Sequence, residues 1–156
     1  MSRAFTREDD NEALADIGDL PISPHRNLVT AEGIMQMEKH VNRLRKEFAE
    51  AEKKQEREAM AIATRDLRYW QTRRETAELS VPEPDERLVR FGMTVRLEGQ
   101  DGKHVTWKIV GEDEADPHAG KISHVSPMAQ SMFGKGVGET FELNGKEWEI
   151  VEVRVV

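Results

Sequence analysis

Apolar residues recur at alternating steps of three and four over residues 34–51, the spacing of one face of an α-helix. These positions are Ile34, Met37, Val41, Leu44, Phe48 and Ala51. A second series follows a short polar break and is interrupted only by an arginine whose stem can pack: Met60, Ala63, Leu67, Trp70, Arg74 and Ala77. Two stripes of similar length predict an antiparallel helical hairpin, a short coiled coil. One continuous helix is the alternative, because residues 53–58 contain no glycine or proline.

The ends of this helical region carry recognisable signals. Thr30 can cap a helix, and Glu32 lies in the first turn, where a carboxylate faces the positive end of the helix dipole. No proline interrupts residues 31–80, and Pro82 and Pro84 then end the pattern. The hairpin is therefore predicted over residues 30–80, with a linker over residues 81–87.

After the linker the apolar period changes from that of a helix to that of a strand. Apolar and polar residues alternate over 89–97, and Asp-Gly at 101–102 and Asn-Gly at 144–145 are hairpin turn signals. Ser126-Pro127 and Gly134 bracket a short helix over 126–133. Trp107 and Trp148, at strand spacing, are predicted to be core residues. Residues 88–156 thus predict a small antiparallel β domain with one short helix, and the chain is of the α+β class.

Residues 1–29 have no sustained apolar period and contain Gly18, Pro21 and Pro24. This composition favours a flexible N-terminal tail. The alternative is a segment that folds on a partner.

Composition narrows the function. The chain has no cysteine, which excludes disulfides and thiolate chemistry, and no apolar run approaches the length of a membrane helix. We therefore expect a cytoplasmic protein without a membrane partner. The formal charge is −7, and the only segment with excess base, residues 30–80, alternates in sign. Direct DNA binding is disfavoured, because it usually needs a basic stripe.

Several ordered motifs resemble the C-terminal domain of the Gre transcription elongation factors. The opening strand is similar at residues 91–95 (Phe-Gly-Met-Thr-Val), followed by residues 110–116 (Val-Gly-Glu-Asp-Glu-Ala-Asp) and 122–123 (Ile-Ser). Residues 126–129 (Ser-Pro-Met-Ala), 134–135 (Gly-Lys) and 137–139 (Val-Gly-Glu) continue the likeness. Residues 29–33 are similar to the start of the Gre coiled coil, and residues 68–75 are similar to the base of its second helix in the GreB branch.

The resemblance implies an FKBP-like C-terminal domain that docks on RNA polymerase beside its secondary channel. In the family, the coiled coil enters that channel, and acidic residues at its tip help hold a catalytic magnesium ion. The polymerase then cuts backtracked RNA. Neither a cofactor nor a small-molecule ligand of the chain itself is implied. A prolyl isomerase, the activity of FKBP enzymes, is disfavoured, because the aromatic residues of the β domain are mostly committed to its core.

The chain departs from the family pattern at the hairpin tip. The family's acidic tip stretch has no counterpart, and residues 30–91 are about twenty residues short, which removes roughly 15 Å of reach. The short hairpin resembles Rnk-type members. We therefore expect a polymerase-binding regulator rather than an enzyme, with no catalytic residues of its own. The alternative is a genuine cleavage factor that acts through carboxylates at the tip.

Two groups of residues are candidates for these contacts. The tip candidates lie around the turn, among Lys53, Lys54 and Arg57, and a solvated hairpin end is their alternative reading: Glu50, Glu52, Glu56 and Glu58. The polymerase-contact candidates lie in the acidic turn and the short helix: Asp113, Glu114, Asp116, Ser126, Pro127, Met128 and Phe133. No metal site is expected, because the acidic turn lacks calcium-loop spacing and the five histidines form no cluster.

Overall fold

The computed structural model describes residues 17–156, and the earlier part of the tail prediction lies outside the described residues. The chain divides into two compact units. One contains residues 35–76 together with the segment that ends at Pro24, and the other contains residues 25–34 and 77–156. We call them the hairpin unit and the β unit.

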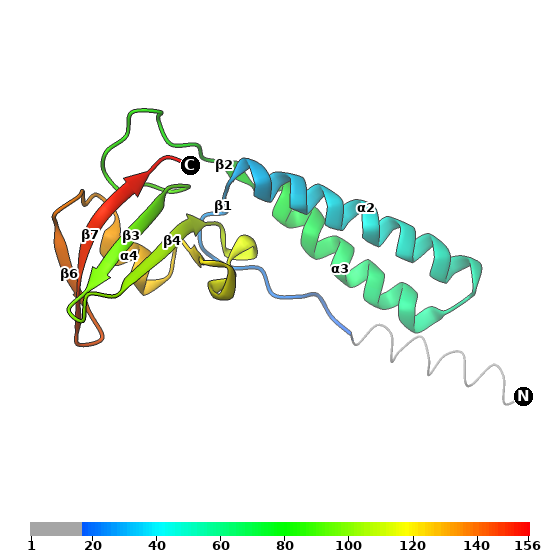
Figure 1. Ribbon diagram of the computed structural model, residues 1–156. Helices are drawn as coiled ribbons and strands as arrows, with labels where there is room; N and C mark the ends of the chain where they lie inside the picture. Colours follow the sequence, from blue (N-terminus) through cyan, green and yellow to red (C-terminus); the bar gives the residue numbers. More distant parts are fainter. Residues whose placement is uncertain (1–16) are drawn as a thin grey trace, which may run out of the picture. The chain divides into compact units, whose positions relative to one another are not determined.

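Two antiparallel helices form the hairpin unit (Figure 1). Helix α2 runs over Ala31–Lys53 and helix α3 over Arg57–Glu75. The helical hairpin is thus confirmed, and the single long helix is wrong. The reason is local: Gln55 adopts a left-handed backbone conformation with φ 55°, which reverses the chain without a glycine.

The interior of the hairpin unit is narrow. The apolar series of α2 supplies most of the buried side chains: Met37, Val41, Leu44 and Ala51. Helix α3 buries only Ala63 and Arg73, the latter 1% exposed. The prediction that Arg74 occupies the seam is wrong, because Arg74 lies outside and pairs with Glu38 at 3.1 Å. A shift of one residue rotates a helical side chain by about 100°, enough to exchange inside for outside.

Helix α3 also ends earlier than the absence of proline predicted. Its C-cap is Thr76, and Glu78–Leu79 form strand β2 instead of a last helical turn. Strand β2 pairs in parallel with strand β1, Leu28–Val29, in the β unit. A pairing with residues about fifty positions earlier in the chain therefore overrides the local helical pattern.

The β unit contains a five-stranded sheet in the order β5-β4-β3-β7-β6. Its strands are β3 (Thr94–Gly99), β4 (His104–Val110), β5 (Lys121–Ser123), β6 (Thr140–Leu143) and β7 (Lys146–Arg154). All neighbouring pairs are antiparallel except β4 and β5, so the sheet is mixed. The α+β class is confirmed, with this one parallel pair as a difference from the antiparallel prediction.

One apolar core fills the β unit. Most of its fully buried members come from β3, β4, β7 and helix α4, which runs over Pro127–Met132: Val95, Leu97, Ile109, Ile150, Ala129 and Met132. Trp107 and Trp148 pack against this core but are only partly buried. Val89 and Phe91 are buried as the alternation predicts, although β3 begins later, at Thr94. Gly92 has φ 86°, so the backbone there cannot continue a strand.

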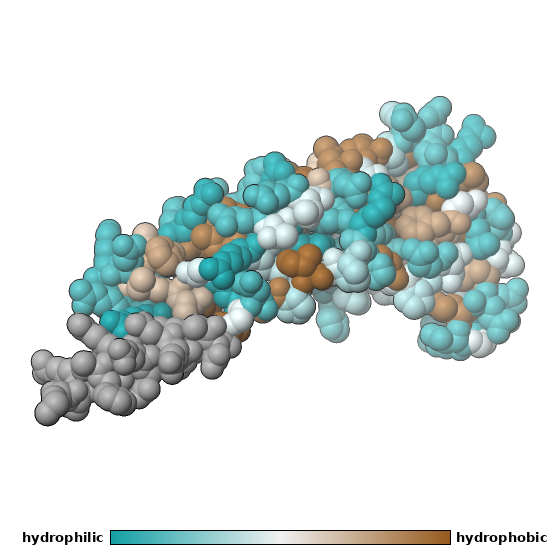
Figure 2. Space-filling view, turned by 180° about the vertical axis from the view of Figure 1, so that it is seen from behind, coloured by the Kyte–Doolittle hydropathy of each residue, from teal (hydrophilic) through white to brown (hydrophobic). Residues whose placement is uncertain are grey.

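The surface is mostly polar. Figure 2 shows apolar patches separated by hydrophilic side chains on the face that it draws. The large apolar side chains that are exposed belong to many elements: Ile22, Met35, Ile62, Leu79, Val81, Leu88, Val137 and Val156. Over residues 17–156, no helix combines the length and the apolar character needed to cross a membrane.

Candidate functional site

The hairpin turn consists of Lys54, Gln55 and Glu56. Backbone hydrogen bonds close it: the Glu56 amide donates to the Ala51 carbonyl at 2.9 Å, and the Gln55 amide donates to the Glu52 carbonyl at 3.1 Å. Helix α3 starts without a side-chain cap, because Glu56 occupies the N-cap position and makes no capping bond. The turn is thus held by the backbone, and its side chains are left to the surface.

All four tip candidates are exposed. Glu50 forms an exposed ion pair with Lys54 at 3.5 Å. Within the described residues, no three acidic or histidine side chains are placed together so that they could hold a metal ion. Lysine and arginine alternate with these carboxylates along the chain. Any metal that the carboxylates bind would have to be held mainly by a partner.

The acidic turn of the β unit divides its carboxylates between inside and outside. Residues Glu112–Glu114 form a short 3-10 helix, η1, after Gly111. The Glu114 carboxylate accepts hydrogen bonds from the amides of Thr30 at 3.1 Å and Gly111 at 3.0 Å, and from the Thr30 hydroxyl. It thereby satisfies donors at the start of α2. Glu114 is therefore used within the chain, whereas Asp116 is exposed.

The position of Glu114 also explains why residue 33, in the first turn of α2, is a glycine. A Cβ atom on Gly33 would lie 2.4 Å from the Glu114 carboxyl carbon. The Gly33 amide donates to the Thr30 hydroxyl at 3.0 Å, so Thr30 caps the helix as its sequence position predicted. A glycine at this position lets the carboxylate approach the helix backbone closely.

Helix α4 displays the other contact candidates. Ser126 caps α4 and accepts a hydrogen bond from the Ala129 amide at 3.2 Å, and Pro127 takes the first helical position. A second 3-10 helix, η2 (Pro117–Ala119), lies before β5 in the chain. Pro127 is exposed, whereas Met128 and Phe133 are half-buried and pack against the core. Gly134 ends this region with φ 79°, as predicted. The structure brings these residues together on one short element, separate in the chain from the acidic turn.

His124 is a buried residue that the sequence did not single out. It is 6% exposed, its ring meets Phe91 edge-on at 5.6 Å, and its Nε2 has no hydrogen-bond partner in the described part of the chain. Burial lowers the pKa of the His124 imidazole, Glu112 opposes this effect, and His25 adds to it. The neutral ring is therefore favoured in the fold. No sequence pattern marks a lone histidine as buried.

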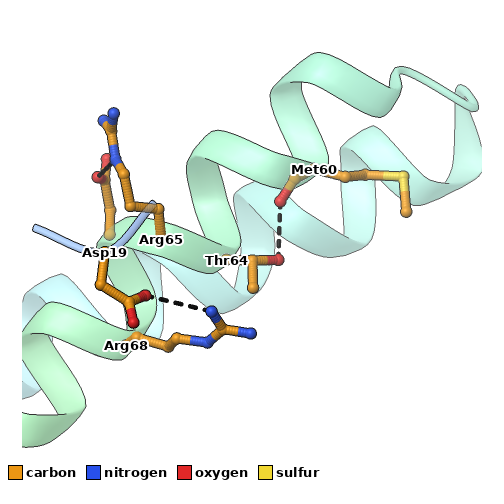
Figure 3. A network of polar contacts seen from close by, with 6 residues as sticks. Asp19, Met60, Thr64, Arg65 and Arg68 are labelled. Atoms are coloured by element: carbon orange, nitrogen blue, oxygen red, sulfur yellow. Dashed lines mark hydrogen bonds and ion pairs between the residues drawn. The ribbon is translucent and has the colours of Figure 1, made fainter. Parts of the chain in front are cut away.

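The segment from Ile17 to Pro24 was expected to be part of a tail, but it belongs to the hairpin unit, and Asp19 lies beside helix α3 (Figure 3). Asp19 accepts an ion-pair hydrogen bond from Arg68 at 3.2 Å, and Thr64 beside it donates to the Met60 carbonyl at 2.8 Å. The acid at position 19 and the arginines of α3 were visible signals, but their sequence separation gave no reason to pair them.

The β unit contains the residues that match a known protein family. Residues 83–156 match the family model described as "Transcription elongation factor, GreA/GreB, C-term". The transcription elongation factor GreA of Methylobacterium sp. (strain 4-46) is 47% identical over 73 residues, covering 44% of this chain and 46% of that protein. GreA of Neisseria meningitidis serogroup A is 45% identical over 76 residues, covering 46% and 48%. These matches span about half the length of the curated relatives.

Among solved structures, GreA factor homolog 1 (Gfh1) of Thermus thermophilus is 21% identical, with a TM-score of 0.41, over 83% of this chain and 99% of that one. The ordered motifs, the sheet with its capped short helix, and the matched residues 83–156 describe one domain. Residues 83–156 therefore form a domain of the GreA/GreB C-terminal type.

Proposed function

We propose that this chain is a cytoplasmic regulator of transcription elongation that binds RNA polymerase through its β unit at the secondary channel. The match of residues 83–156 to the GreA/GreB C-terminal family carries this proposal. The match covers the half of the chain that, by the resemblance, docks on the polymerase. The outward acid Asp116 and the exposed Pro127 of α4 offer contact positions on that unit.

The hairpin supports a role without strong cleavage. Helix α2 has 23 residues and α3 has 19. At 1.5 Å per residue, α2 is about 34 Å long, short of the family's coil by the roughly 15 Å that the missing residues represent. Within the described residues, the tip carboxylates also form no group of three that could hold a metal ion. Metal-assisted chemistry tolerates errors of only tenths of an ångström, so such a deficit leaves the tip outside the active centre.

The first experiment is RNA cleavage in a backtracked elongation complex with labelled transcript and excess purified chain. We expect intact RNA, together with competition against a full-length Gre factor, because both occupy the same channel. The competition is the binding control. If the chain neither displaces the Gre factor nor co-migrates with the polymerase, the binding proposal fails.

The same assay judges the alternative, a genuine cleavage factor. Glu56 and Glu58 are exposed at the start of α3 and are the carboxylates placed to act at the tip. Cleavage that is present in the natural chain and lost in Glu56→Gln/Glu58→Gln would establish that alternative. A matched variant, Glu142→Gln/Glu149→Gln in the β unit, should leave cleavage unchanged.

A further inference from the structure

Strand β2 bonds to β1 through alternate residues. The Glu78 amide donates to the Asn27 carbonyl at 2.8 Å, and the Ser80 amide donates to the Val29 carbonyl at 3.1 Å. In a parallel pair, the residue between two such donors directs its own amide and carbonyl to the other side of the strand. The backbone of Leu79 therefore faces away from β1.

The side of β2 that faces away from β1 is an open sheet edge. Strands β1 and β2 form a two-stranded sheet, and in the part of the chain that the structure describes no third strand joins it. The other side of β1 is occupied, because a Cβ atom on Gly111 would lie 2.4 Å from the Leu28 carbonyl oxygen. The next amide, that of Thr30, donates to Glu114. An unpaired strand edge is a template for a further strand.

Two apolar side chains accompany the open edge of β2. Leu79 is 59% exposed, and Val81, two residues later, is 67% exposed. Glu78, the acid within β2, is already used, because it pairs with Arg26 at 3.1 Å. The edge thus offers backbone hydrogen-bonding groups together with apolar surface, which are the two features that an added strand uses.

Charge decides which kind of strand can pair with this edge. Residues 77–86 contain four acids and no base, and Glu83 and Asp85 are exposed. A second copy of β2 would bring the same acids against them, and like charges on neighbouring strands destabilise the pairing. A strand that carries lysine or arginine between apolar residues complements both the acids and the exposed Leu79 and Val81.

We propose that the open edge of β2 binds an extended basic peptide segment of a partner protein, which adds a third strand to the β1–β2 sheet. The backbone of the segment pairs with the amide and carbonyl of Leu79. Its apolar residues pack on Leu79 and Val81, and its basic residues face Glu83 and Asp85. This inference goes beyond the proposed function, and its test contains no polymerase, so either can fail without the other.

A synthetic peptide tests the open edge in the full-length chain. The probe is acetyl-Lys-Val-Arg-Val-Lys-Val-amide, added to isotope-labelled protein and followed by NMR of the backbone amides. We expect the signals of residues 78–81 to shift and binding to weaken as salt rises. Hydrogen exchange of the Leu79 amide should slow by about tenfold at saturating peptide, because that amide gains a hydrogen bond. The same peptide with every backbone amide methylated keeps its side chains and charge, and it should not bind.

One substitution separates the backbone of β2 from its apolar surface. Proline is tolerated in an edge strand where the amide faces solvent. Leu79→Pro therefore removes the outward donor, spares the bonds of Glu78 and Ser80 to β1, and should abolish binding. Leu79→Ala keeps the amide and should weaken binding less. Circular dichroism checks that both variants fold, and the methylated peptide tests the same donor if Leu79→Pro does not.

A second pair of variants tests the charges. Glu83→Gln/Asp85→Gln should weaken binding and flatten its salt dependence. The matched control, Glu142→Gln/Glu149→Gln, removes two exposed acids from β6 and β7 and should leave both unchanged. Absent binding, equal binding of the methylated peptide, shifts centred outside residues 78–81, or equal weakening by the two double variants would each overturn the proposal.

Discussion

The contacts within the β unit differ in kind from the contacts within the hairpin unit. In the β unit, strands distant in the sequence meet: Leu97 of β3 pairs with Ile150 of β7, and both are fully buried. In the hairpin unit, a narrow stripe from α2 faces α3, and exposed ion pairs such as Arg74 with Glu38 lie beside it. Exposed ion pairs of this kind contribute little to stability.

This difference explains where family likeness resides. The match to the GreA/GreB C-terminal family lies in residues 83–156, whose strand register depends on many long-range pairings at once. A coiled coil can lose whole turns from its far end without disturbing the packing of the remaining turns. The hairpin is therefore the part whose length can change while the β unit keeps its fold.

Replacing one buried leucine by alanine in each unit should give the largest difference in stability between the two units. We expect Leu97→Ala to lower the free energy of unfolding by about 4 kcal/mol and Leu44→Ala by about 2.5 kcal/mol, because the rigid sheet collapses less into a cavity. Both side chains are at most 1% exposed. Urea unfolding followed by circular dichroism and tryptophan fluorescence gives both values. An equal or larger loss for Leu44→Ala would break the comparison.

Glu114 tests how far the start of α2 depends on the β unit. Glu114→Ala leaves the Thr30 and Gly111 amides without their acceptor, and we expect a loss of about 2 kcal/mol. Glu114→Gln keeps one carbonyl oxygen and should lose about half as much. Asp116→Ala is the control, because its side chain caps no amide. Equal losses for Glu114→Ala and Asp116→Ala in urea unfolding would contradict the assigned role.

Gly33 also lies beside the Glu114 carboxylate, and here helix propensity and the close approach of Glu114 predict opposite effects of an alanine. Helix propensity favours alanine over glycine by about 1 kcal/mol. A Cβ at Gly33 would nevertheless lie 2.4 Å from the Glu114 carboxyl carbon. We expect Gly33→Ala to be destabilising by about 1 kcal/mol on balance. Asn42→Ala, on the exposed face of α2, should instead stabilise slightly, and thermal melting compares the two. A stabilised Gly33→Ala would refute the close approach.

The smallest expected effect is the pH dependence of stability that His124, in the β unit, causes. Burial holds the pKa of its imidazole below the ordinary value of 6.5. The unfolded chain therefore binds the proton more readily, so the stability that the neutral ring confers is present above about pH 6.5 and falls as the pH drops towards the lowered folded value. The free energy of unfolding measured with urea should therefore fall over this pH range.

The His124→Gln variant provides the control for that pH dependence. It should flatten the slope of stability against pH in this interval. A slope that is identical with and without the imidazole would show that other groups cause it.

Several features could be predicted from the sequence because they depend on neighbouring residues. The two helices follow from apolar spacing, the turns at Gly102 and Asn144-Gly145 follow from residues that accept positive φ, and the α4 cap follows from Ser126 and Pro127. Each requires only backbone preferences and a repeated pattern within a few positions.

Other features were decided only by the tertiary structure. Strand β2 replaces a predicted helical turn because β1 offers it hydrogen bonds, and Arg73 rather than Arg74 turns inward. Glu114 faces the start of α2, and Asp19 meets Arg68 on α3. The sequence by itself thus determined the two long helices, the short helix α4 and the turns, because local propensity and apolar period act between near neighbours. The choice among chemically equivalent side chains came from the fold, because it depends on which distant backbone donors and charges are brought within hydrogen-bond distance.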